Sequence, residues 1–395
     1  MWRCPRERTH SSPRTLAESV SIRLNPFKGS DGPAGETVPW NRHGRMLDGR
    51  PSFITDPLLH AGCYYVQDSS AMFPGHIFRR ELRRMGNPSG LRVLDLCAAP
   101  GGKTTDLATS LREACGDDFM LVSNEVMKAR ARVLCDNVAL WGDPSVCVTG
   151  VDPAVIGRLL PDYFDIILAD VPCSGEGMFR KDPRAESEWS PELVELCAAR
   201  QKRILADVWP ALRGAGVLIY STCTYEDAEN DANLLWAARE LGGEVLPAED
   251  AFSDWGVKVT SCGNLLKAGE VPGEGQWVGA LVKAAGGGSR RRGGDLSALR
   301  PLRPGIPGAQ RKGKDMVPHP DMALGIFFDK DSYPCAEVDL QTALRFLHRD
   351  TIVLPDAPAG YNVICYRGHP LGFVKNLGAR CNNLHPQGRR ILKDI

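Results

Sequence analysis

The stretch RVLDLCAAPGGKT, from Arg92 to Thr104, decides how this sequence is expected to fold. It opens with a short apolar run, Val93–Cys97, of the kind that forms a buried parallel strand. A Pro-Gly-Gly turn follows, and Lys103–Ala108 then indicates the start of a helix. Such a strand, turn and helix form a nucleotide-binding corner, because glycine lets the backbone approach a ligand and the helix N-terminus offers unpaired N–H groups.

Three interpretations of this corner compete. A P-loop needs Gly-x-x-x-x-Gly-Lys-Ser/Thr, and Cys97 stands where its first glycine is required. A dinucleotide fingerprint needs three spaced glycines, which Ala98-Ala99-Pro100 does not provide. The third is the S-adenosylmethionine corner of a class I methyltransferase, where the turn holds the methionine end and an acid after the next strand binds the ribose. Glu125, in LVSNEV, stands at that position, so the third interpretation is favoured.

Length and composition indicate a globular protein of more than one domain, since 395 residues exceed one ordinary domain. The formal net charge is zero, so attraction to nucleic acid must come from local basic patches. The thirteen cysteines include no Cys-x-x-Cys pair that would suggest a metal, and several lie in apolar runs, as expected in a reducing cytosol. With no membrane-length apolar stretch and no signal-peptide core, a cytoplasmic protein is predicted.

Between Leu91 and Lys283, strand-like and helix-like segments alternate. This alternation predicts an α/β fold, a Rossmann-like doubly wound parallel sheet with helices on both faces and ligands beyond the carboxyl ends of its strands. The predicted strands are Val93–Cys97, Phe119–Asn124, Val146–Thr149, Phe164–Val171, Val217–Thr222 and Trp277–Lys283. The predicted helices are Lys103–Glu113, Met127–Leu140, Pro191–Leu212 and Ala228–Leu241.

The flanking segments differ from this alternating region in amino-acid composition. Residues 1–50 are an Arg- and Pro-rich lead-in, and residues 51–88 are expected to form a cap that includes a helix at Ala71–Met85, before a catalytic domain at 89–284. Residues 285–315 are rich in Gly, Pro and Arg. This segment, with Arg290-Arg291-Arg292, Arg311, Lys312 and Lys314, is either a flexible linker or a surface that contacts phosphates.

Residues 316–395 predict a second, small α+β domain. Its expected elements are a helix at Leu340–Leu347 and strands at Thr351–Leu354, Tyr361–Tyr366 and Gly372–Lys375.

Two cysteines follow neighbouring predicted strands. FDIILADVPCSGEG, from Phe164 to Gly177, places Pro172-Cys173 after a strand that ends in Asp170. VLIYSTCTYEDAEND, from Val217 to Asp231, repeats the arrangement with Cys223. Each cysteine alone is either a nucleophile or proton donor or a half-buried structural residue. Because consecutive strands on one side of the crossover are neighbours, both should face the same crevice as the cofactor corner.

Two thiols and a carboxylate in one crevice suit methylation of cytosine at carbon 5. That carbon is a poor nucleophile, so a thiolate must first add to carbon 6. After methyl transfer, a base must remove the proton on carbon 5 so that the thiolate can leave. The pyrimidine ring must also be stabilised while charge moves onto it, which a nearby acidic group can do.

The two motifs resemble those of the NOL/NOP/Sun family of RNA 5-methylcytosine methyltransferases, whose Pro-Cys and Thr-Cys motifs match Pro172-Cys173 and Thr222-Cys223. The resemblance implies that Cys223 is the nucleophile and that Cys173 assists breakdown of the adduct, with Asp170 beside them. In the DNA cytosine methyltransferases these two roles are exchanged. The implied cofactor, S-adenosylmethionine, would be bound by Cys97, Ala98, Ala99, Pro100, Gly101, Gly102, Lys103, Glu125, Asp152 and Asp170.

Within that family the sequence is most similar to the bacterial RsmF-type 16S ribosomal RNA enzymes, through CSGEGMFRKDP (Cys173–Pro183), DPLLHAGCYYVQDSSAM (Asp56–Met72) and the tail. The tail resembles their PUA-like RNA-binding domain. This implies a monomer that acts on ribosomal RNA or the small ribosomal subunit and contacts no membrane. Transfer RNA, or a ribosome-assembly role with little activity, is the alternative. Arg180 and Lys181 either contact the RNA or form a solvated charge pair.

Two departures from the family pattern stand in this sequence. The family usually carries a longer N-terminal RNA-binding segment before the SIRLNP stretch, where a short arginine-rich segment is found here, so a truncated N-terminus is one expectation. Val171 replaces the more usual alanine before Pro172, a change expected to be tolerated.

Overall fold

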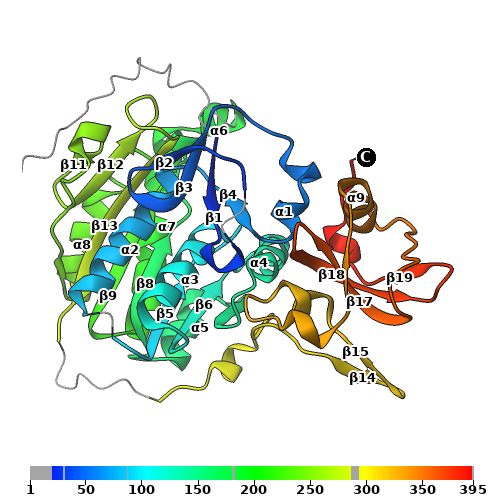
Figure 1. The fold of residues 1–395 in the computed structure, drawn as a ribbon. Coiled ribbons are helices and arrows are strands. Elements are labelled where there is room, and N and C mark those ends of the chain that lie inside the picture. Colours follow the sequence, from blue (N-terminus) through cyan, green and yellow to red (C-terminus); the bar gives the residue numbers. More distant parts are fainter. Residues whose placement is uncertain (1–19, 30–31, 87, 180–182, 286–292, 394–395) are drawn as a thin grey trace, which may run out of the picture.

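The computed structural model describes residues 20–29, 32–86, 88–179, 183–285 and 293–393 (Figure 1). The predicted basic cluster Arg290-Arg291-Arg292 and the loop residues Arg180 and Lys181 lie outside the described residues. Among the described helices, none combines the length and the apolar character that a membrane span needs.

The largest layer is a nine-stranded mixed sheet of order β11-β12-β13-β9-β8-β5-β6-β7, in which β10 also pairs with β13. Its first five strands in chain order run parallel, as the sequence predicted. They are β5 (Leu91–Asp95), β6 (Phe119–Asn124), β7 (Val146–Thr149), β8 (Phe164–Asp170) and β9 (Leu212–Thr222). The others are β10 (Gly243–Val245), β11 (Lys258–Val259), β12 (Gly263–Lys267) and β13 (Gly275–Lys283).

The last predicted strand, Trp277–Lys283, lies in β13 but runs antiparallel to β9, which corrects the expectation of an all-parallel sheet. The chain reaches β13 from the hairpin partner β12, so it enters the sheet from the opposite end. The predicted helix Pro191–Leu212 is also shorter in the structure. It ends at Val208, and a short turn, Trp209–Ala211, leads directly into β9.

Helices cover both faces of this sheet, and each face has its own apolar core. On one face lie α2 (Phe73–Arg84), α3 (Gly102–Cys115) and α4 (Lys128–Trp141). On the other lie α5 (Pro153–Leu159), α7 (Pro191–Val208) and α8 (Asp231–Leu241). The short helix α6 (Pro183–Glu188) precedes α7, and α5 was not predicted from the sequence.

The N-terminal part forms a four-stranded antiparallel sheet of order β2-β3-β1-β4. The short helix α1 (Pro57–His60) lies in the chain between β3 and β4. The sheet includes residues on both sides of the boundary expected at residue 50. Its strands are β1 (Val20–Leu24), β2 (Glu36–Val38), β3 (Asn41–Leu47) and β4 (Tyr64–Val66).

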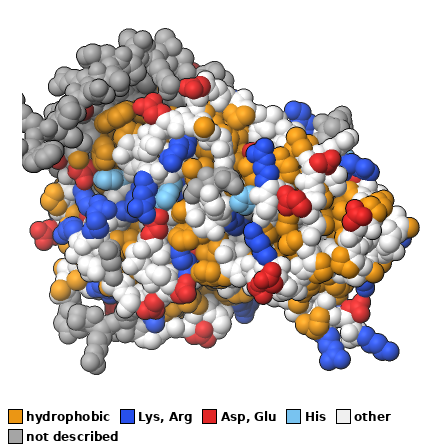
Figure 2. Space-filling view, viewed as in Figure 1, with side chains coloured by type: hydrophobic (Ala, Val, Ile, Leu, Met, Phe, Trp, Pro, Cys, Tyr) orange, Lys and Arg blue, Asp and Glu red, His pale blue; other side chains and the backbone are white. Residues whose placement is uncertain are grey.

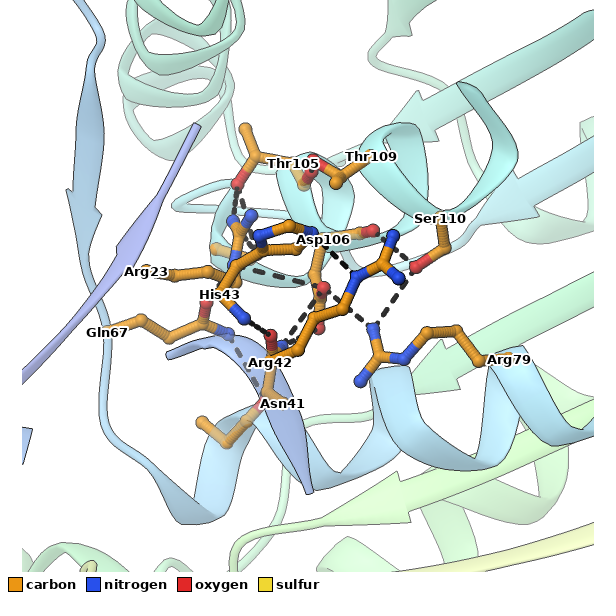
Figure 3. A network of polar contacts seen from close by, with 12 residues as sticks. Arg23, Asn41, Arg42, His43, Gln67, Arg79, Thr105, Asp106, Thr109 and Ser110 are labelled. Carbon is orange, nitrogen blue, oxygen red and sulfur yellow. Dashed lines mark hydrogen bonds and ion pairs between the residues drawn. The ribbon is translucent and has the colours of Figure 1, made fainter. Parts of the chain in front are cut away.

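A buried polar network joins this sheet to α3 (Figure 3). The fully buried Arg23 of β1 donates to the carbonyl oxygen of Gly102 at 3.1 Å and also contacts Thr105. The Asp106 carboxylate forms ion pairs with this arginine and with Arg79 of α2, whose Nη1 lies 3.0 Å away. The N-terminal sheet therefore contacts the first turn of α3, directly after the predicted cofactor turn.

The C-terminal part contains a four-stranded sheet of order β16-β17-β18-β19 and one helix, α9 (Leu340–His348), at the right of Figure 1. Its strands are β16 (Cys335–Glu337), β17 (Gly360–Tyr366), β18 (His369–Asn376) and β19 (Cys381–Asn383). The predicted strand at Thr351–Leu354 is wrong, because this segment is a loop. Its apolar side chains Ile352 and Leu354 are nevertheless buried, in a core that also contains Ile22 and Tyr64 of the N-terminal sheet.

Between the large sheet and the C-terminal part, residues 310–317 form a two-stranded hairpin of β14 (Gln310–Lys312) and β15 (Asp315–Val317). It projects at the lower right of Figure 1.

Candidate active site

The predicted cofactor turn lies at the carboxyl end of the central strand β5. Gly101 has φ of +113°, a conformation that glycine adopts without steric strain, and α3 begins at the next residue. Two side chains of α4 hold the turn by hydrogen bonds. Arg130 donates to the carbonyl oxygen of Ala99 at 2.7 Å, and Asn137 donates to that of Pro100 at 2.7 Å. The turn from Cys97 to Lys103 is therefore fixed from outside by the neighbouring helix.

Two buried acidic residues lie near this turn. Glu125, after β6, is 3% exposed; one carboxylate oxygen accepts from the N–H of Met127 at 2.9 Å, and the other lies 3.4 Å from Nη1 of Arg130 in an ion pair without hydrogen-bond geometry. Asp95, which the sequence analysis did not select, has a buried oxygen without a hydrogen-bond partner, and burial raises its pKa to about 7. Asp152 is exposed and caps α5 by accepting from the N–H of Ala154. For Asp95, the apolar neighbours in the sequence VLDLC indicate that its side chain is buried.

The end of β8 places an ion pair beside the turn. Asp170 lies 2.8 Å from the Nζ atom of Lys103, and it accepts hydrogen bonds from the Ser221 hydroxyl at 2.7 Å and the Gln276 amide at 3.1 Å. Burial disfavours the charged form of Lys103, but the Asp170 carboxylate outweighs it and raises the pKa of Lys103. The lysine therefore remains a cation at the edge of the site.

The two motif cysteines are brought together because β8 and β9 are adjacent parallel strands, with Asp170 opposite Ser221. The sulfur atoms of Cys173 and Cys223 are 3.0 Å apart, and both residues are half-buried. The backbone N–H of Cys223 also donates to the Cys173 sulfur at 3.2 Å. The shared crevice expected from the sequence is thus present in the fold.

The electrostatics of the pair favour a thiolate on Cys223. The hydrogen bond from Cys173 is the main cause that lowers the pKa of Cys223, and the charge of Lys103 acts in the same direction, against burial and Asp170. The same hydrogen bond, together with burial, raises the pKa of Cys173 well above its usual range. The N–H of Cys223 on its own would favour charge on Cys173, but it does not reverse this order.

A buried carboxylate that the sequence analysis missed supports the Pro-Cys loop from behind. Glu229 is fully buried and accepts from the N–H of Ser174 at 3.1 and 3.3 Å. Gln201 bridges Glu229, at 2.6 Å, to the carbonyl oxygen of Pro172, at 3.0 Å. The loop that carries Cys173 is therefore fixed on both sides of the cysteine. Four acids stand between residues 226 and 231, of which Glu229 and Asp231 are buried, and nothing in the sequence distinguishes Glu229 from the others.

A cavity of about 490 Å³ opens beside these groups. Its lining includes both thiols, Asp170, Cys97 and Ala99, with Arg130 and Arg200 at its walls. Burial raises the pKa of Cys97, so that thiol stays neutral. Glu125 and Asp152 are not among the lining residues. The cavity is large enough for a nucleotide-sized ligand and brings two thiols and a carboxylate together.

Comparisons with known proteins agree with this geometry. Residues 87–240 match the family of 16S rRNA methyltransferases RsmB/F, and residues 333–391 match the RsmF-type methyltransferase PUA domain. The sequence is 36% identical over 258 residues to the ribosomal RNA small subunit methyltransferase F of Pectobacterium carotovorum, covering 63% of this chain and 51% of that protein. It is 37% identical over 249 residues to the protein of the same name from Escherichia fergusonii, covering 59% and 50%.

The chain therefore spans about half the length of the curated relatives it matches. Among solved structures, a methyltransferase homologue from Pyrococcus horikoshii is similar with a TM-score of 0.55 and 25% identity, over 68% of this chain and 88% of that one. The structure of PH0851 has a TM-score of 0.59 at 22% identity, over 68% and 61%, and shows the same fold.

Proposed function

Because residues 87–240 form a methyltransferase domain of the RsmB/F family and residues 333–391 a PUA domain of the RsmF type, we propose that this chain methylates carbon 5 of a cytosine in small-subunit ribosomal RNA. The methyl donor is S-adenosylmethionine. The observation that carries the proposal is the 3.0 Å separation of two thiols in a cavity that they share with Asp170 and with Cys97 and Ala99 of the cofactor turn. The name of the curated relatives supports ribosomal RNA over transfer RNA.

The residues of the corner fit this cofactor, which when bound supplies an electrophilic methyl group. Asp95 offers a buried oxygen without a hydrogen-bond partner, and the buried Oε2 of Glu125 has only the 3.4 Å ion pair with Arg130; the ribose hydroxyls and ammonium group of the cofactor are donors that such oxygens can accept. The positive φ of Gly101 lets the turn lie against Leu134 and Asn137 of α4 without a side chain between them. We assign the turn Cys97–Lys103 to the methionine end, Glu125 to the ribose, Asp152 to the surroundings of the adenine and Asp170 to the methyl-transfer side.

The chemistry starts at Cys223. Its thiolate adds to carbon 6 of the cytosine, forming a C–S bond and moving electron density to carbon 5, which then accepts the methyl group. Asp170 is fixed by three polar partners, so its carboxylate can accept a hydrogen bond from the exocyclic amino group of the cytosine and hold the ring in position for the attack. The target base must first be turned out of its helix, since carbon 6 is unreachable while the base is stacked.

Release of the product needs a second group. The proton on carbon 5 must pass to a base before the C–S bond can break and regenerate the Cys223 thiolate. Cys173 is the group we assign to assist this step, because its sulfur lies 3.0 Å from that of Cys223. The contacts that Glu229 and Gln201 make with the Pro-Cys loop keep Cys173 at that distance.

A methyl-transfer assay with tritiated S-adenosylmethionine should label bare 16S ribosomal RNA or assembled small subunits, and leave transfer RNA unlabelled. Bisulfite sequencing of the product should then show protection at cytosine, because methylation at carbon 5 slows deamination. Label in transfer RNA alone would favour the transfer RNA alternative. The absence of label in every RNA, with binding retained, would identify an RNA-binding assembly protein instead.

The charge of Lys103 affects the pKa of the Cys223 thiol, and this predicts how the rate of methyl transfer depends on pH. Methyl transfer should fall as pH decreases through the pKa of Cys223, because the thiolate is lost. Replacing Lys103 by methionine removes a cation that favours the thiolate, so the rising limb of the pH–rate profile should move to higher pH. Lys103→Arg retains the charge and serves as the control. Single-turnover rates at saturating cofactor measure both, and an unmoved limb in Lys103→Met would contradict this role.

A further inference from the structure

The hairpin of β14 and β15 has no packing role that accounts for it. Its two strands pair only with each other, in the register Arg311↔Met316 and Lys312↔Asp315, and they join no other sheet of the described chain. An isolated two-stranded hairpin is marginal in water. Residues 310–316 are all exposed, so little apolar burial holds it in place. A contact with another molecule therefore explains the hairpin better than packing within this chain does.

The hairpin concentrates positive charge at its tip. Arg311, Lys312 and Lys314 lie within four residues, around the turn at Gly313. The one acid of the hairpin, Asp315 of β15, forms an ion pair with Lys375 of β18 at 2.8 Å, so it does not neutralise the positive charge of the tip. Lys and Arg side chains gather at the lower right of Figure 2, where the hairpin projects in Figure 1. In a chain of zero formal charge, this is a local cluster of three cations.

The same ion pair joins the hairpin to the C-terminal sheet. Lys375 lies opposite Tyr361 in the register of β17 and β18, and its Nζ atom is 5.2 Å from the centre of the Tyr361 ring. The cations of the hairpin are thus followed by a lysine and a half-buried tyrosine of the C-terminal domain, which resembles an RNA-binding domain. Basic side chains interleaved with aromatic rings are the pattern of a nucleic-acid surface.

We propose that the β14–β15 hairpin is an RNA phosphate-binding arm, which holds the substrate at a place away from the nucleotide in the active site. This inference rests on the proposed function, because ribosomal RNA is the partner whose phosphates it would contact. The three cations carry no base-reading geometry, so they supply affinity and register but no sequence preference.

The test is the salt dependence of RNA binding. Each phosphate contact releases counterions and contributes about 0.7 to 0.9 to the slope of log affinity against log salt. The combined variant Arg311→Ala, Lys312→Ala and Lys314→Ala should therefore lower that slope by about 2 to 3 and weaken binding of 16S ribosomal RNA by roughly ten- to hundredfold at physiological salt. Lys312→Arg with Lys314→Arg keeps the charges and should keep the slope.

A matched control replaces three exposed cations elsewhere, Arg158, Arg239 and Lys258, by alanine. It should change the slope little. Equal slopes for the hairpin variant and the wild type would overturn the proposal, as would an equal loss in the control. Because the slope is measured without methyl transfer, the result separates from that of the proposed function. With the hairpin variant, kcat at saturating RNA should stay unchanged while KM rises.

Discussion

Replacing Cys223 by alanine should abolish methyl transfer to RNA, with a loss on the order of 10³-fold or more, because the proposed bond to carbon 6 is made by the Cys223 sulfur. The tritiated-methyl assay on 16S ribosomal RNA measures this loss. Cys197→Ala is a matched control, since Cys197 is a buried cysteine of α7 that lines the same cavity but belongs to neither cysteine motif. That control should retain most of the activity.

The result also distinguishes between the two possible nucleophiles. If Cys223→Ala keeps its activity while Cys173→Ala loses it, the roles are those of the DNA cytosine methyltransferases, and the assignment of Cys223 is wrong. RNA binding should be unchanged in Cys223→Ala, because the substitution removes one half-buried sulfur and no charged phosphate contact. A loss of binding would indicate damage to the fold rather than to the chemistry.

Replacing Cys173 by alanine should trap the covalent adduct between Cys223 and the RNA. Without Cys173, the C–S bond forms but is broken slowly, since the group assigned to this step is absent. The adduct should run as a slow band on a denaturing gel and should disappear after RNase treatment. Normal turnover with no adduct would show that Cys173 has no part in product release.

Two controls make this outcome specific. The double variant Cys173→Ala and Cys223→Ala should give no slow band, because the adduct needs the Cys223 sulfur. The band should also form faster as pH rises in Cys173→Ala. The hydrogen bond from Cys173 is the main cause that lowers the pKa of Cys223, so its removal raises that pKa and makes the thiolate scarcer at neutral pH.

The sequence predicted the parallel part of the fold well, because each strand there is a short apolar run between turn signals. Phe119–Asn124 and Val146–Thr149 have the bounds that the periodicity indicated. The prediction failed where a polar or charged side chain is buried. The strand β1 was hidden because it contains Arg23, which is buried by its pairing with Asp106 and by contact with the Trp141 ring. No propensity rule foresees a buried cation whose partners are distant in sequence.

The opposite error occurred at Thr351–Leu354. Ile352 and Leu354 alternate as in a strand and are buried as in a strand, yet their backbone forms a loop. Alternation reports which side chains face a core, and a loop that inserts two apolar side chains gives the same pattern.

The candidate site was predictable to the extent that it lies at strand ends. Asp170, Cys173 and Cys223 follow adjacent parallel strands, so the topology alone brought them together, and the family domains match the resemblance that the motifs indicated. Asp95 and Glu229 were missed because their importance comes from burial. The apolar neighbours of Asp95 indicate its burial, but its unpartnered oxygen and the contacts of Glu229 to the Pro-Cys loop become visible only when the packing is known.

One hydrophobic core joins residues that the ribosome makes at very different times. Ile22, Phe53 and Tyr64 of the N-terminal part share it with Phe346 and Ile364 of the C-terminal part. During synthesis the early strands must therefore wait, with their apolar side chains uncovered, until nearly three hundred further residues have been added. Such a delay leaves apolar surface of the nascent chain uncovered, and it couples completion of the C-terminal part to the folding of the first strands.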